Sequence, residues 1–348
     1  MRKLDLKEIK SNFVKRYKGS KDGLRSFSVC PYVNLLGEGI EKLCFISTNF
    51  SIETIVALIL SDEESFCYMC DDSDIEHVAG THELTKSFTD DEENIVFGEI
   101  ARKKGKIKGA KILFDFALEE EKFKMKKEAV FTALEMINSG SIRQDNMIKL
   151  QAFFAKANTL LYKCDTLEYL NVDFSDCKLI LITGDAKEEK IDEMLMESYE
   201  QLKKEYGISD ICTFLQNKPK PDDLKKRYIV NEIARIKEFY NEIKSCGELN
   251  QRCCEILAES SIEFFSICEK SGKKLEKMYK TAQNTGLSET VFISIEYGGI
   301  VAVVKNENVD KFVDIYTEEH KKTAGDIPAV YICNSADSGV ELSDVESE

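Results

Sequence analysis

The chain has 348 residues, of which 48 are Lys or Arg and 63 are Asp or Glu, so its formal net charge is −15. A general nucleic-acid binder needs an excess of basic residues and is therefore excluded. No apolar run reaches the roughly 18 residues that cross a bilayer, so we expect no membrane-spanning helix.

Hydrophobic residues at 43% and charged residues at 32% are typical of a folded globular protein. Apolar residues recur at helical and at strand spacing in both halves of the chain. In chain order the pattern predicts a helix in 1–18, strands at 26–30, 43–50 and 53–61, a helix at 95–103, a strand at 106–116, a helix at 119–137, a strand at 178–183, helices at 187–206 and 222–245, one or two helices in 250–284, strands at 292–297 and 300–304, a helix at 309–322 and a strand at 329–333.

The length predicts two domains. Only four residues are Pro and 18 are Gly, which disfavours a long flexible linker, so we expect a packed boundary near residues 183–187. The expected division is an N-terminal lobe at 1–184, a C-terminal lobe at 185–342 and an acidic tail at 343–348.

Twelve cysteines are spread along the chain, and its charged start does not resemble a signal peptide. We therefore expect a cytoplasmic protein whose cysteines are free thiols. Cys67 and Cys70 form the single CxxC motif, and three histidines do not complete a zinc site, so no metal centre is expected. The two cysteines are interpreted as small apolar residues of a strand.

One segment resembles a family signature. Residues 29–42, VCPYVNLLGEGIEK, are similar to the galactokinase motif APGRVNLIGEHTDY. Further segments resemble galactokinases in the family's order: YIVNEIAR at 228–235, GEL at 247–249, YGGIVAVV at 297–304 and SADSGVEL at 335–342. The chain is thus similar to the galactokinase branch of the GHMP kinases. The resemblance implies a two-lobed α+β fold that binds ATP and sugar in a cleft between the lobes.

The resemblance also assigns a sugar site. Glu38 matches the family's Glu, and Glu41 is the candidate to replace the family's Asp. Tyr199 is the candidate for the Tyr near the sugar, after four extra residues are allowed. These three residues are the expected sugar-binding set.

The positions that carry the family's chemistry are changed. The Arg of GRVN, which stabilises the transferred charge, is Tyr32, and the GAG of the third motif is Ser294-Ile-Glu296. The catalytic base falls on Ile148, or on Met147 in a gap-free alignment, and neither accepts a proton.

The Gly-rich phosphate loop, PIGAGLSSSA in the family, falls on EEEKFKMKKE at 119–128, which has no glycine for close backbone approach. The residues that remain as a degenerate nucleotide-binding loop are Glu121, Lys122, Lys124, Lys126 and Lys127.

Three interpretations follow. In the first, the protein has lost phosphoryl transfer, fully or nearly so, and acts by binding a small sugar or a protein partner, with no cofactor assigned. In the second, it is a divergent sugar kinase that uses Mg-ATP to convert galactose or a related sugar to its 1-phosphate, with Asp145, Asp185 or Glu38 as a substitute base. In the third, it is an unrelated α+β scaffold protein.

Overall fold

The computed structural model describes residues 4–18, 22–71, 73, 75–80, 97, 108–117, 129, 133, 156–184, 191–217, 219–268, 271–324, 328–337 and 339–342. The chain forms two compact units. The first consists of residues 1–31, 51–155 and 337–348, and the second of residues 32–50 and 156–336. The chain therefore passes more than once between the units. The lobe boundary expected at residue 184 stays a prediction, and residues 156–336 lie in one unit.

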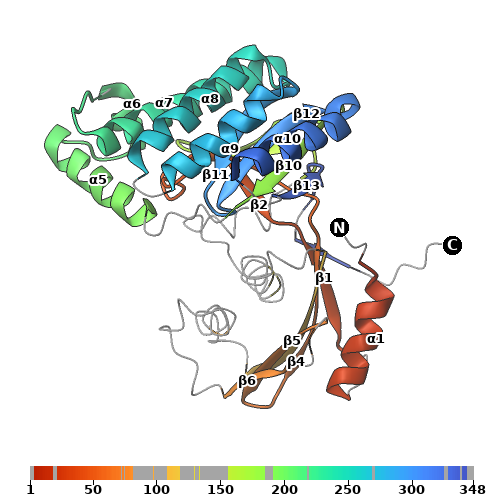
Figure 1. Ribbon diagram of the computed structural model, residues 1–348. Coiled ribbons are helices and arrows are strands. Elements are labelled where there is room, and N and C mark those ends of the chain that lie inside the picture. Colours follow the sequence, from red (N-terminus) through yellow and green to blue (C-terminus); the bar gives the residue numbers. More distant parts are fainter. Residues whose placement is uncertain are drawn as a thin grey trace. The chain divides into compact units, whose positions relative to one another are not determined.

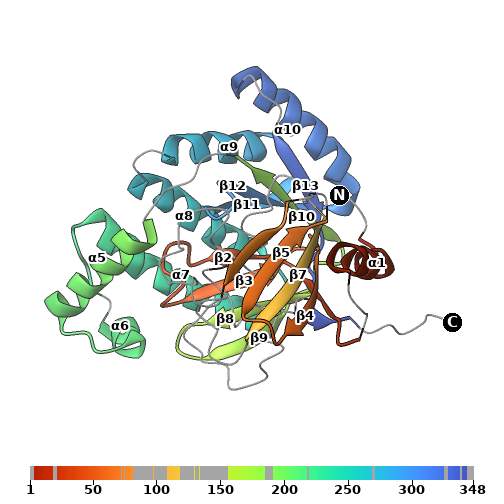
Figure 2. The ribbon, with the colours of Figure 1, turned by 90° about the horizontal axis from the view of Figure 1, so that it is seen from below.

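The first unit contains a six-stranded sheet in which β5 and β7 pair in parallel and the other neighbours are antiparallel. The strand order is β14 (Val340–Glu341), β1 (Arg25–Val29), β4 (Thr54–Ser61), β7 (Gly109–Phe116), β5 (Ser65–Cys70) and β6 (His77–Gly80). Helix α1 (Leu6–Tyr17) lies beside β4 and β7 (Figure 2).

The first turn of α1 is capped by Asp5, whose carboxylate accepts a hydrogen bond from the backbone N–H of Lys7 at 2.8 Å. Ile9 and Phe13 of α1 are buried against Ile55 and Leu113 of the sheet. The helical spacing of these two residues therefore supplies the apolar face that attaches α1 to the sheet.

The second unit contains two antiparallel four-stranded sheets and the helices α5 to α10. One sheet has the order β2 (Tyr32–Leu36), β3 (Phe45–Asn49), β8 (Thr159–Lys163) and β9 (Leu167–Asn171). The other has the order β11 (Ser288–Ser294), β12 (Gly299–Lys305), β10 (Cys177–Thr183) and β13 (Ala329–Cys333). The helices are α5 (Ile191–Tyr206), α6 (Ile211–Asn217), α7 (Leu224–Cys246), α8 (Gln251–Ile267), α9 (Gly272–Asn284) and α10 (Val309–Ala324), with a short 3-10 helix at Asn306–Asn308.

Helices α9 and α10 cover the β11–β12–β10–β13 sheet (Figure 1). Ile180 and Ile182 of β10 are buried against Met278 of α9 and Phe312 of α10. The continuous apolar run of β10 agrees with its burial on both faces, since Leu179 to Thr183 are all buried.

Most predicted elements of the described residues are confirmed. Strands β2, β8 and β9 were not predicted, nor were α6 and β14. The three strands are short and carry polar residues, and they form by pairing: β2 and β8 with β3, and β9 with β8. The helices expected at 95–103 and 119–137 lie outside the described residues except for Phe97, Ala129 and Ala133. The tail at 343–348 lies outside them as well. Within the described part of the chain, no helix is long and apolar enough to cross a membrane.

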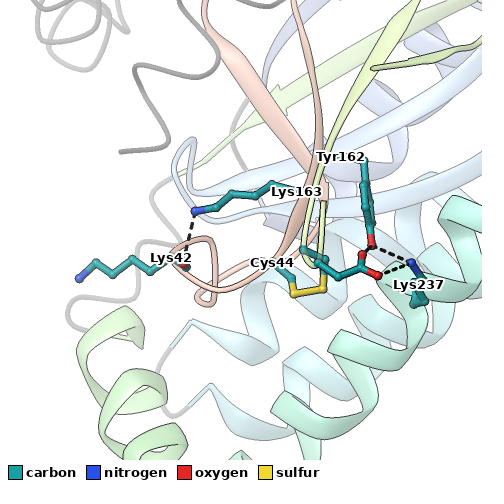
Figure 3. The surroundings of a disulfide bond; sticks show 7 residues. Lys42, Cys44, Tyr162, Lys163 and Lys237 are labelled. Carbon is teal, nitrogen blue, oxygen red and sulfur yellow. Dashed lines mark hydrogen bonds and ion pairs between the residues drawn. A yellow bond between two sulfur atoms is a disulfide. The ribbon is translucent and has the colours of Figure 1, made fainter. Parts of the chain in front are cut away.

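The expectation of free thiols is wrong for one pair. Cys44 and Cys164 form a disulfide with their Cα atoms 4.3 Å apart (Figure 3). The two residues lie where β3 and β8 pair, and strand pairing is a tertiary feature that cysteine spacing does not reveal. Cys67 and Cys70 lie on β5 as predicted, both buried and both free.

Candidate functional site

The turn between β2 and β3 carries the two carboxylates expected to bind sugar. Gly37 and Gly39 have φ of +98° and +76°, a region that favours glycine. A Cβ on Gly37 would lie 2.5 Å from the carbonyl oxygen of Cys44. The backbone N–H of Ile40 donates to the Gly37 carbonyl at 3.0 Å, which closes the turn. The glycines of VNLLGEG are thus required by backbone geometry, and they place Glu38 and Glu41 on one tight turn.

Helix α7 holds this turn through a buried ionic network. The carboxylate of Glu232, which is 0% exposed, accepts hydrogen bonds from the Gly37 N–H at 2.8 Å and from the Ser260 hydroxyl at 3.0 Å. Arg235 donates to Glu232 at 2.9 Å and to Glu263 at 2.8 Å. These bonds compensate the cost of burying the Glu232 charge, so α7 can present a fixed acceptor to the backbone of the turn.

A second contact from α7 reaches the next residue of the turn. The hydroxyl of the buried Tyr228 donates to the carbonyl of Glu38 at 2.9 Å. Glu38 itself is only 4% exposed. The stretch YIVNEIAR, singled out by its resemblance to galactokinases, therefore supplies both residues that fix the turn, Tyr228 and Glu232.

Glu41 lies within electrostatic range of two other acidic residues, Asp192 of α5 and Glu296, and the three are called the carboxylate cluster. Its Oε1 accepts hydrogen bonds from the Asn34 amide at 3.2 Å and from the Gly39 N–H at 3.0 Å. Burial, followed by the negative charges of Asp192 and Glu296, raises the pKa of Glu41 to about 8. Burial and Glu296 also raise the pKa of Asp192. The cluster favours neutral Glu41 at pH 7, a form that can donate as well as accept a hydrogen bond.

The structure brings together two positions at which the sequence departs from the galactokinase pattern. The Tyr32 hydroxyl donates to the Glu296 carboxylate at 2.8 Å, although the residues are 264 positions apart. Tyr32 is only 6% exposed. A neutral phenol and a carboxylate therefore occupy the places where the resemblance implies a cationic guanidinium and a glycine.

Tyr199, the third residue expected to bind sugar, is buried between helices. Its side chain is 5% exposed and its ring lies 6.0 Å from that of Phe214 in α6. Burial raises the pKa of its hydroxyl. Leu195, one helical turn earlier, lies against Gly39. Tyr199 therefore belongs to the packing of α5 and α6, and its role in sugar binding stays a prediction.

The remaining predicted site residues lie outside the described residues. They are Glu121, Lys122, Lys124, Lys126 and Lys127 of the degenerate loop, Ile148 and its alternative Met147, and the substitute bases Asp145 and Asp185. In the ranges that the structure describes, no group of three or more His, Cys, Asp or Glu side chains is arranged to hold a metal ion.

Sequence reasoning missed Asp192, because α5 carries no motif and only the fold brings this residue to Glu41. Glu232 lies inside the segment YIVNEIAR, and it falls on the same helix face as the apolar residues Ile229 and Ile236. An acidic residue on an apolar helix face is a sequence signal for a buried, paired charge.

No protein-family model matches the sequence. Galactokinase from Clostridium perfringens strain SM101 is 24% identical over 205 residues, which are 54% of this chain and 53% of that protein. Galactokinase from C. perfringens strain 13 matches equally, at 24% identity over 205 residues, with the same coverage. The chain thus spans about half the length of the curated relatives it matches.

Solved structures extend the similarity to nearly the whole chain. Lactococcus lactis galactokinase, in a complex with galactose, has a TM-score of 0.78 at 17% identity and covers 97% of this chain and 99% of its own. Mevalonate kinase from Methanococcus jannaschii has a TM-score of 0.55 at 11% identity, with coverage of 89% and 98%. Homoserine kinase from Cytophaga hutchinsonii has a TM-score of 0.51 at 13% identity, with coverage of 93% and 99%. The chain has the galactokinase-like α+β fold of the GHMP kinases, and in sequence it is a distant relative of the galactokinases.

Proposed function

We propose that this protein binds a small sugar through the turn that carries Glu38 and Glu41, and that it does not transfer a phosphoryl group at a galactokinase's rate. The hydrogen bond between Tyr32 and Glu296 is the observation that carries the proposal. The sugar is inferred from the fold, because the L. lactis structure contains galactose. We also propose that the protein is cytoplasmic and that it binds a protein partner.

The polar groups of the turn suit a polyhydroxylated ligand. Gly39 and Asn34 already orient the Glu41 carboxyl group, so little side-chain entropy is lost when a ligand binds it. A carboxyl group beside others accepts hydrogen bonds from sugar hydroxyls in either protonation state.

The pair of Tyr32 and Glu296 does not suit a transferred phosphate. Phosphoryl transfer depends on cationic groups that stabilise the charge of the transition state. A phenol lacks that charge, and Glu296 adds a negative one. Loss of one preorganised donor costs about 10²–10³ in rate, and the changes at Ile148 and in the loop at 119–128 would lower the rate further. The residues therefore do not fit Mg-ATP as the resemblance would place it.

The test separates binding from chemistry. Titration calorimetry with galactose is expected to show binding to the wild-type protein, and Glu41→Gln is expected to weaken it. Glu319→Gln, an exposed residue of α10 paired with Lys322, is the matched control and should change nothing. A coupled assay for ADP with Mg-ATP and a panel of sugars should show no sugar-dependent turnover.

Two results would contradict the proposal. Sugar-dependent ADP formation would establish the divergent kinase, and Asp145→Asn and Asp185→Asn would then identify its base. The absence of heat with every sugar at millimolar concentration would remove the sugar ligand and direct the search to a protein partner. The double variant Tyr32→Arg/Glu296→Gly is expected to improve ATP binding if the pair is what excludes it.

A further inference from the structure

The disulfide links the site turn to a neighbouring hairpin (Figure 3). Cys44 ends the turn that begins at Gly37, and Cys164 directly follows β8. Phe45 of β3 pairs with Lys163 of β8, so the antiparallel register sets the two cysteines opposite one another. The two cysteines therefore face one another just beyond the last paired residues of β3 and β8.

The hairpin formed by β8 and β9 is attached to α7 independently of the disulfide. Lys237 of α7 donates to Asp165 at 2.7 Å, and Asp165 also accepts the Tyr162 hydroxyl (Figure 3). The ammonium group of Lys237 lies 4.7 Å from the centre of the Tyr240 ring, and the Tyr240 hydroxyl donates to Glu168 of β9 at 2.9 Å. Opening the disulfide would leave this hairpin in place.

The turn is anchored unequally at its two ends. Its first residues are held by the buried contacts of Glu232 and Tyr228 with Gly37 and Glu38. Its last residues, from Ile40 to Cys44, include Glu41. These residues are held to one another, since the Leu43 and Cys44 N–H groups donate to the Ile40 carbonyl at 2.8 and 3.1 Å. The disulfide and a long, exposed hydrogen bond of 3.4 Å from the Lys163 ammonium to the Lys42 carbonyl join this end to the hairpin. Reduction would therefore loosen the half of the turn that carries Glu41.

Cys164 is the less buried of the two cysteines. It is half-buried, whereas Cys44 is 0% exposed.

We propose that the disulfide between Cys44 and Cys164 is a reversible switch that sets the mobility of the site turn. A thiolate of a dithiol reductant attacks Sγ of Cys164, and Cys44 leaves as the thiolate. The second thiol of the reductant then displaces Cys164, so the protein gains two electrons as two thiols and the reductant becomes a disulfide. In the oxidised protein the disulfide ties the end of the turn that follows Glu41 to the hairpin, and reduction removes that tie. The consequence for sugar affinity rests on the proposed function, whereas the change in mobility does not.

The experiment titrates the native protein with mixtures of reduced and oxidised dithiothreitol. Alkylation followed by peptide mass spectrometry reports the state of Cys44 and Cys164. Hydrogen exchange of residues 37–44 is expected to quicken severalfold on reduction, and galactose affinity to fall roughly threefold to tenfold through lost preorganisation. Cys164→Ser should behave as the reduced form in every mixture. Cys246→Ser, which removes an exposed free thiol, is the matched control.

Three outcomes would overturn the inference: alkylation of both cysteines even under oxidising conditions, a bond that opens only in denaturant, or reduction that leaves hydrogen exchange of the turn unchanged. If neither form binds galactose, the proposed function fails, and hydrogen exchange still decides the switch.

Discussion

Arg235→Met would break the buried network that holds the site turn. The Arg235 side chain is 9% exposed and donates to Glu232 at 2.9 Å and to Glu263 at 2.8 Å, with its guanidinium 5.9 Å from the centre of the Tyr228 ring. Methionine keeps an unbranched apolar stem in the same space and removes the charge. The substitution therefore tests the ionic part of the network with little loss of packing.

The expected cost follows from what is left behind. Removing one partner of a buried ion pair typically costs about 3–5 kcal/mol, because the other charge stays buried. Glu232 would lose its charged partner but keep the Gly37 N–H and the Ser260 hydroxyl. Nη2 of Arg235 makes no hydrogen bond among the described residues, so its removal costs nothing further. We expect a loss of about 3 kcal/mol, at the lower end of that range.

The control is Arg252→Met. Arg252 makes three ion pairs, but its side chain is 36% exposed, so its removal should cost about 1 kcal/mol or less. Urea unfolding followed by far-ultraviolet circular dichroism measures both, since the chain has no tryptophan to report by fluorescence. The partners of Arg252 are Glu238, Glu255 and Glu259.

Equal losses for the two methionine variants would refute the reasoning, because burial would then not govern the cost. A further check is the double variant Glu232→Gln/Arg235→Met, which removes the stranded charge. It should recover part of the loss, about 1 kcal/mol or more. Arg235→Met, which disturbs the contacts of Glu232 with the turn, should weaken galactose binding more than Arg252→Met does.

Three other substitutions test the site. Glu41→Gln tests the pH dependence of stability. The pKa of Glu41 is raised to about 8 in the folded protein, so between about pH 4.5 and 8 the folded state keeps a proton that the unfolded state has lost, and stability falls as pH rises. The variant removes this group, so the slope of unfolding free energy against pH, measured by urea titration, should lessen by up to about 1.4 kcal/mol per pH unit. Tyr32→Phe leaves Glu296 without the phenolic donor and should cost about 1–2 kcal/mol of stability; an unchanged unfolding midpoint would show that the hydrogen bond contributes nothing. Gly37→Ala forces a Cβ against the Cys44 carbonyl at a φ of +98° and should cost more than about 1 kcal/mol of stability. Gly207→Ala, also at a positive φ (+63°) but with nothing within 4 Å of the added Cβ, should cost less.

Much of the fold follows from local patterns. Strand β10 is a continuous apolar run, and helices α7 and α10 are long segments with apolar residues at helical spacing. Each can therefore be predicted from its own residues, without knowing which element it packs against. The short strands β2, β8 and β9 were not predicted, because each is a strand only through pairing across the sheet.

The sequence by itself determined the order of the elements, the resemblance to galactokinases, and the positions at which the family's Arg and Gly are replaced. Only the tertiary structure decided that Tyr32 bonds Glu296, that Asp192 raises the pKa of Glu41, and that two cysteines 120 residues apart are joined. The physical reason is that helix and strand periodicity depends on neighbours in the chain, whereas hydrogen bonds, Coulomb interactions and disulfides depend on distances in space, which strand register and helix packing set.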